Sequence, residues 1–151
     1  MPHSRFIVSD SNGCDKYIVT GQSGSPFQKM AISSVQGTVL VNIRVAPLCF
    51  FSAFAVSQHK DRFLMVCADK HAKHFRFYGI NWVFSLSSDR RSFEISDTSG
   101  TPVMLQSAEN LLSKGYYELD IFCQSKELFC VAAAVCANTY AIADSVLAAT
   151  V

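Results

Sequence analysis

Charged residues are scarce in this sequence, and those that are present nearly cancel. They make up 17% of the 151 residues, and 13 Lys and Arg against 12 Asp and Glu leave a formal net charge of +1. Bulk charge therefore gives no reason to expect a nucleic-acid partner. The opening MPHSRFIVSD also lacks a charged segment followed by an apolar one, so we expect no signal peptide and a cytosolic protein with reduced thiols.

Motifs of catalysis and metal binding are missing as well. None of the six cysteines is spaced as CxxC, and the chain has no GxSxG, glycine-rich phosphate loop or HExxH. Cys67, His71 and His74 lie close in sequence but lack a clear fourth ligand for tetrahedral zinc. We therefore predict a protein that is not an enzyme, with no catalytic residue, no metal and no cofactor. A cysteine-based redox or enzymatic function, for example at Cys67, is the alternative that these residues leave open.

Short apolar stretches separated by turn residues fill the chain from residue 5 to residue 123. In 38–46, Val39, Val41, Ile43 and Val45 share one face while Asn42 and Arg44 take the other, which is typical of a half-buried strand. The same reading predicts eleven strands, at 6–9, 16–21, 28–33, 38–46, 50–57, 62–68, 74–78, 81–86, 92–96, 102–107 and 116–123. Even spacing without helical interruptions predicts an antiparallel barrel or sandwich.

The pattern changes to one long helix near the end of the chain. Residues from about 126 to 149 are rich in alanine and hold no Gly or Pro, with Ser125 as the expected N-cap and Glu127 in the first turn. A membrane span needs about 20 apolar residues, whereas the run 128–137 is broken by Asn138, Thr139 and Asp144. A slender helix that is apolar nearly all round fits the bore of a small barrel. We therefore predict a buried helix and no transmembrane span.

These elements resemble a known family. The segments FIVSDSNGCDKYIVTG, KMAISSVQGTVLVNIR, GINWVFS and FEISDTSGTPVMLQ, with the ending ADSVLA, resemble the YxjI / LURP-one-related family of the tubby C-terminal-like superfamily, to which the phospholipid scramblases are also related. The resemblance covers almost the whole chain, and implies one domain over 1–151. It also implies a twelve-stranded antiparallel barrel that encloses the hydrophobic C-terminal helix.

The chain departs from that family in two places. The family usually has one strand before the first of these motifs, and here the chain begins almost at the motif. The barrel is then open at that point, or a partner strand fills the gap, or the strand count is wrong by one. The basic residue that the family carries after its tenth strand is also replaced by the sequence SAEN at 107–110.

The resemblance directs attention to basic residues, because tubby domains bind phosphoinositide headgroups through Lys and Arg on neighbouring strands. Lys29, Arg44, Lys60 and Arg62 fall on or between the third to sixth predicted strands, and are the predicted headgroup-binding residues. A second group of basic residues consists of Lys70, Lys73, Arg76, Arg90 and Arg91. A solvated barrel surface is the alternative explanation for both groups.

Two polar residues of the predicted helix are expected to be structural. A buried carboxylate must be paired, hydrogen-bonded or neutral, so we expect Asp144 to bond the barrel near one of its mouths, and Asn138 to be a buried polar residue of the same kind. The sequence as a whole predicts a cytoplasmic binding domain, peripheral at a membrane if its ligand is a lipid. Its expected partner is an anionic phospholipid headgroup or a protein. The alternative is a lipid-handling, scramblase-like membrane protein, and the oligomeric state stays open.

Overall fold

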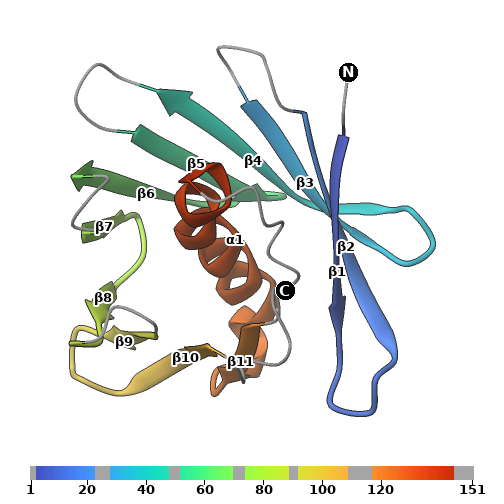
Figure 1. Cartoon of the computed structure of the whole chain (residues 1–151). Coiled ribbons are helices and arrows are strands. Elements are labelled where there is room, and N and C mark those ends of the chain that lie inside the picture. The colour runs from blue at the N-terminus through green and yellow to red at the C-terminus, as the bar shows by residue number, and fades with distance from the viewer. Residues whose placement is uncertain are drawn as a thin grey trace.

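The structure of the protein is a computed structural model, and it describes residues 3–22, 28–47, 52–69, 74–88, 92–108 and 117–144. These ranges contain eleven strands followed by a short 3₁₀ turn and one α-helix (Figure 1). The elements are β1 His3–Ser9, β2 Asp15–Gln22, β3 Gln28–Ser34, β4 Val39–Pro47, β5 Ser52–Gln58, β6 Asp61–Asp69, β7 His74–Tyr78, β8 Trp82–Leu86, β9 Phe93–Asp97, β10 Pro102–Ala108, β11 Tyr117–Ile121, the 3₁₀ turn Gln124–Lys126 and α1 Glu127–Asp144.

All eleven strands belong to one antiparallel sheet in which each strand pairs with the next along the chain. The sheet curves around α1, and β1 and β11 remain as its two edges among the described strands (Figure 1). Hairpins of this kind bring sequence neighbours together, so alternation along each strand places its apolar side chains on one face. The concave face accordingly carries the core, and the convex face carries the exposed side chains.

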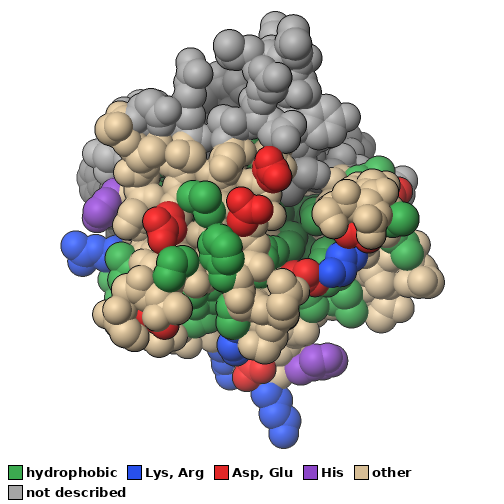
Figure 2. Space-filling view, turned by 90° about the horizontal axis from the view of Figure 1, so that it is seen from below, with side chains coloured by type: hydrophobic (Ala, Val, Ile, Leu, Met, Phe, Trp, Pro, Cys, Tyr) green, Lys and Arg blue, Asp and Glu red, His purple; other side chains and the backbone are tan. Residues whose placement is uncertain are grey.

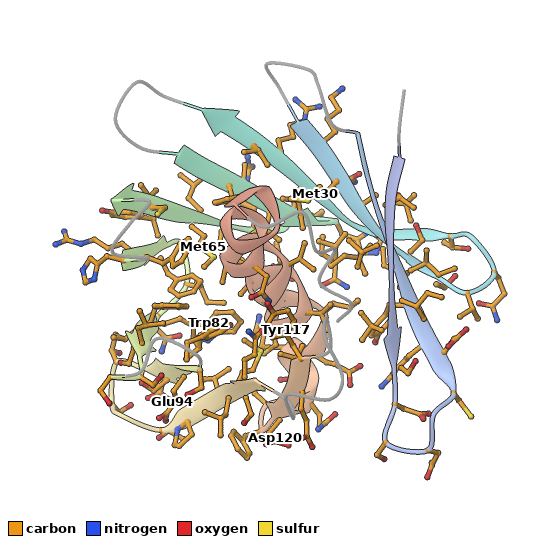
Figure 3. The ribbon with its side chains drawn as sticks, in the orientation of Figure 1. Met30, Met65, Trp82, Glu94, Tyr117 and Asp120 are labelled. Carbon is orange, nitrogen blue, oxygen red and sulfur yellow. The ribbon has the colours of Figure 1, made fainter. Side chains whose placement is uncertain are left out.

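The helix α1 is the centre of that core. Every residue from Phe129 to Asn138 is buried, including three consecutive alanines, which are 0% exposed. The phenyl ring of Phe129 meets that of Phe63 on β6 edge-on at 5.0 Å between centroids, and Phe63 also contacts Trp82 on β8. Met30, Met65 and Trp82 are found around the helix in Figure 3. The sheet thus supplies large side chains, and the helix supplies small ones that let the strands approach.

One hairpin shows how the sequence fixes the local turns. Asp97 ends β9, and its carboxylate accepts backbone N–H bonds from Ser99 and Thr101, both at 2.9 Å. These bonds, the one from Thr101 above all, lower the pKa of Asp97. Gly100 closes the turn with a φ of 89°, a conformation that glycine adopts without steric cost. The segment 97–100 is therefore the hairpin connection that its sequence predicts.

The eleven predicted strands are all present, with ends that differ from the prediction by a few residues at most. A closed barrel is not what the described residues form, because β1 and β11 are not hydrogen-bonded to each other. The N-cap prediction is wrong. Ser125 lies inside the 3₁₀ turn, whose own cap is Cys123, and α1 begins two residues later at Glu127. The last five residues of the predicted helix, 145–149, lie outside the described residues. Within the described part, no helix combines the length and hydropathy that a membrane crossing requires.

Ala133 provides a test of the tightly packed centre. Replacing this fully buried residue in Ala133→Leu forces extra methyl groups against the surrounding strands, and we expect a loss of about 1–3 kcal/mol in the free energy of unfolding. Urea unfolding followed by circular dichroism measures it. Ala55→Leu makes the same change at an exposed position of β5 and should be close to neutral. Equal effects of the two substitutions would contradict the central packing of α1.

Candidate functional site

Three of the four predicted headgroup-binding residues meet on the convex face of the sheet. Lys29 on β3 pairs directly across the strands with Arg44 on β4. Arg44 in turn is opposite Ala55 on β5, and Ala55 is opposite Leu64 on β6. Arg62 lies on β6 two residues before Leu64, and therefore points to the same face. We call the outward side chains of β3–β7 around Lys29, Arg44 and Arg62 the cationic face.

Small residues on β5 leave this face hollow between the cations. Ala55 forms the shared floor of two adjoining depressions of about 540 and 390 Å³. Lys29 and Arg44 line the first depression, and Arg44 and Arg62 line the second. Arg44 and Arg62 are two strands apart, which corresponds to a lateral separation of roughly 9–10 Å between their backbones. Long side chains at that spacing can reach one phosphate group or two neighbouring ones.

The cations of this face are not neutralised by any residue that the structure describes. Lys29, Arg44 and Arg62 are exposed and form no ion pair with any described residue. None of the described residues that alternate onto the same face as Lys29, Arg44 and Arg62 is acidic, and the exposed Asp61, at the start of β6, alternates to the other side. Like charges directly across two strands are unfavourable, so the Lys29–Arg44 pair is a place where a bound anion would relieve repulsion. Exposed apolar side chains adjoin the cations, with Leu64 43% and Tyr78 52% exposed.

Lys60 occupies a different place from the other three. It lies in the two-residue turn between β5 and β6, after His59, whose φ of 54° is left-handed, and it lines neither depression. In the second group of basic residues, Arg76 is exposed on β7, where it is paired with Val66 of β6. Lys70, Lys73, Arg90 and Arg91 lie outside the described residues.

A polar cluster ties the start of α1 to β2. The Glu127 carboxylate accepts hydrogen bonds from Lys16 Nζ at 2.8 Å and from the Tyr17 hydroxyl at 2.5 Å. Burial alone would raise the pKa of Glu127, but the bonds from Lys16 and Tyr17 and the charge of Lys16 lower it overall. Burial and the bond to Glu127 raise the pKa of Tyr17. The cluster therefore holds Glu127 ionised and Tyr17 protonated at neutral pH.

The buried amide of Asn138 has a partner that sequence reasoning missed. Asn138 is 5% exposed, and its side chain exchanges two hydrogen bonds with that of Gln106 on β10, at 2.8 and 3.1 Å. Gln106 occupies an inward position of a strand, where the alternation predicts an apolar residue; that exception is the signal that could have identified it. Asp144 is the last residue of α1, and its side chain lies outside the described residues.

Three of the five described cysteines are buried packing residues. Cys67, Cys130 and Cys136 are buried, Cys123 is half-buried and Cys14 is exposed. Cys67 is 0% exposed, and burial raises the pKa of Cys130 to about 12 and that of Cys136 as well. A reactive thiol needs a lowered pKa and access to solvent, so these three carry no support for the redox alternative. His74 is exposed while Cys67 is buried, and His71 lies outside the described residues.

No protein-family model, curated protein or solved structure matches this chain.

A double-mutant cycle tests the amide pair. Asn138→Leu or Gln106→Met alone leaves one buried amide without its partner, and we expect each to cost about 1–3 kcal/mol in unfolding free energy. The double variant replaces both amides by apolar groups of similar shape and should cost less than the sum of the two. Urea unfolding of the four proteins gives the coupling energy. Additive losses would mean that the pair does not act as a unit.

The pH dependence of stability tests the Lys16–Tyr17–Glu127 cluster. A carboxyl whose pKa is lowered by folding stabilises the protein above its unfolded pKa, and this contribution disappears as the pH falls through the folded value. The unfolding free energies of the parent and of Glu127→Gln should therefore differ most at neutral pH and converge below the ordinary pKa of 4.5. Tyr17→Phe removes one of the two donors and should narrow the difference. A difference in unfolding free energy that stays constant from neutral to acidic pH would contradict the cluster's role.

Proposed function

We propose that this chain is a non-enzymatic, tubby-like binding domain whose cationic face binds the headgroup of an anionic phospholipid. The observation that carries the proposal is the direct pairing of Lys29 with Arg44 across β3 and β4 without an acidic neighbour among the described side chains. Arg and Lys are the side chains best suited to phosphate oxygens, the first through paired N–H groups and the second as a point charge.

The apolar part of the face supports a membrane lipid over a free phosphate. Leu64, Tyr78 and Val83 are between 43% and 52% exposed, and Leu64 is the cross-strand partner of Tyr78. Val83, on β8, is opposite Arg76. Apolar and aromatic side chains beside cations suit the boundary between headgroups and acyl chains, where the aromatic ring and the charge are both accommodated. A cytoplasmic protein that is peripheral at the membrane follows from this proposal.

The proposal includes a barrel-like wall of eleven strands around α1, which a twelfth strand between β1 and β11 would close. Strict alternation between buried and exposed residues along β4, β5 and β6 is what a barrel wall requires. The all-round burial of α1 from Phe129 to Asn138 supports an enclosed helix. A scramblase-like protein in which this helix leaves the sheet has no support from these contacts, since the helix would abandon the aromatic packing between Phe129 and Phe63.

Vesicle flotation tests the lipid site. Vesicles of phosphatidylcholine alone, with phosphatidylserine, or with phosphatidylinositol bisphosphate are mixed with the protein at low salt. Each cation near an anionic surface contributes about 1 kcal/mol, so Arg44→Ala should weaken binding about fivefold, and the triple alanine variant of Lys29, Arg44 and Arg62 about a hundredfold. Ala55→Leu fills the hollow and should weaken binding without removing charge.

Lys126→Ala is the matched control, because it removes one positive charge from the 3₁₀ turn, away from the cationic face. It should leave vesicle binding nearly unchanged. Soluble inositol trisphosphate serves as a competitor: weak competition supports a lipid in a membrane, and full competition at low concentration indicates a free phosphate ligand instead. Equal losses of vesicle binding in Arg44→Ala and Lys126→Ala would refute the proposed site. Binding that does not depend on the charge of the vesicles would also refute it.

A further inference from the structure

The two edges of the sheet have a geometry that one additional strand would complete. All ten neighbouring pairs are antiparallel, so the odd-numbered strands β1 and β11 run in the same direction. An antiparallel sheet closes on itself only with an even number of strands, because its first and last strands must run in opposite directions. One strand placed between β1 and β11 would be antiparallel to both. We call this gap between β1 and β11 the seam.

The seam is a cleft in the described surface. A hollow of about 300 Å³ is lined by Val8 of β1 on one side and by Leu119 and Ile121 of β11 on the other. Val131 of α1 forms part of its floor, and Glu127 belongs to the same wall. Val8, Leu119, Ile121 and Val131 form the apolar part of this hollow, and Asp10, Lys16 and Glu127 give it a charged part. An incoming strand would place its inward apolar side chains against the first part.

The backbone of β11 is directed into this space. The Phe122 N–H donates to the Val103 carbonyl on the β10 side, at 2.8 Å. Since strand residues alternate their backbone groups between the two sides, Ile121 and Leu119 turn theirs to the seam. The Ile121 carbonyl there accepts a hydrogen bond from the Gln124 side chain at 3.2 Å. The Gln124 side chain thus satisfies one backbone carbonyl on the free side of β11, where no described strand pairs. Proteins have to manage the unpaired backbone groups of an edge strand in some such way.

Charge on the outer side of this edge selects the incoming strand. Glu118 and Asp120 are exposed on β11, and Glu94 lies further along the same outer surface on β9. Glu94 and Asp120 are labelled at the lower side of Figure 3, and Figure 2 shows acidic side chains set among hydrophobic ones on this lower face. Opposite charges on directly paired residues stabilise a strand pair, and like charges destabilise it. An incoming strand that carries Lys or Arg outward fits this edge.

We infer that the seam binds an extended segment of a partner protein, with apolar residues alternating inward and basic residues outward, as a twelfth strand between β1 and β11. This strand addition uses main-chain hydrogen bonds for affinity and alternate side chains for specificity. Ile7 on β1 and Phe122 after β11 flank the seam and are 39% and 58% exposed. The incoming strand would cover part of both side chains. The site is separate from the cationic face, and uses none of its residues.

Two other occupants fit the edge less well. Residues 145–151 read SVLAATV and hold no Lys or Arg to meet Glu118 and Asp120. A second copy that paired through its own β11 would set the carboxylates of the two copies across from one another, which is unfavourable. A partner strand with apolar residues inward and basic residues outward suits both the apolar part of the hollow and the acidic outer side of β11.

The probe is a capped nine-residue peptide in which valine and lysine alternate. Its matched controls are the valine and glutamate version and a peptide with the same valines and lysines in two blocks. We expect only the alternating lysine peptide to bind in calorimetry, and to slow amide hydrogen exchange in β1 and β11 together. Glu118→Lys/Asp120→Lys should weaken that peptide about tenfold and favour the glutamate version. Arg44→Ala should leave peptide binding unchanged, which separates this result from that of the lipid experiment.

Several outcomes would overturn the inference. They are absence of binding by the alternating lysine peptide, equal binding by the block peptide, and protection of strands other than β1 and β11. If β1 and β11 are already protected in the free protein and lose protection when residues 145–151 are deleted, the chain's own tail occupies the seam. If protection rises with protein concentration, a second copy occupies it.

Discussion

Burial of α1 on all sides is the constraint on which the rest of the structure depends. A helix with no polar stripe has no face to give to solvent, so the sheet has to curve around it instead of packing against one side. The run of alanines from Ala132 to Ala134 makes the helix thin enough for that enclosure. As a consequence of this enclosure, the concave face of the sheet is used entirely for packing. Recognition of any ligand is therefore left to the convex face, to the turns and to the two strand edges.

The same helix also connects the two ends of the sheet. It follows β11 after a short 3₁₀ turn, and its first residue, Glu127, is bonded to Lys16 and Tyr17 of β2. Covalent continuity on one side and hydrogen bonds on the other thus span the place where β1 and β11 do not pair. This link maintains the curvature of an open sheet without closing the seam. It also explains why an ionised glutamate is placed at the first turn, where the helix dipole favours it further.

Much of the fold could be predicted from the sequence, and the reasons are local. Alternation such as that of Val41, Ile43 and Val45 identifies strands, and the turn residues between the strands separate them. The remainder depends on contacts that are distant in sequence. Glu127 bonds Tyr17 across 110 positions, and Gln106 bonds Asn138 across 32. Serine is a residue type that commonly caps helices, but Ser125 lies inside a 3₁₀ turn. Residue type alone therefore predicted the wrong start for the helix.

In the candidate site, too, the local features could be predicted from the sequence and the long-range arrangement could not. Basic residues on predicted strands could be named from the sequence, since alternation places Arg44 and Arg62 on the exposed face. Their convergence could not, because it depends on the register that puts Lys29 opposite Arg44 and on the small Ala55 between strands β4 and β6. Lys60 is one residue short of β6, yet it belongs to the turn and lies apart from the hollows. Register, which a single sequence does not reveal, decides which cations can share a ligand.

A net charge near zero conceals a separation of charge over this surface. The described residues that share the face of Lys29, Arg44 and Arg62 on β3–β7 are basic or neutral, while β9 and β11 present Glu94, Glu118 and Asp120. Because the sheet curves around α1, the two sets of strands lie on different sides of the helix (Figure 1). A negatively charged membrane would attract the first side and repel the second. Binding through the cationic face would thus orient the molecule with its seam turned away from the lipid. In that orientation the edge strands β1 and β11 stay accessible to a basic strand from a partner while the lipid is bound.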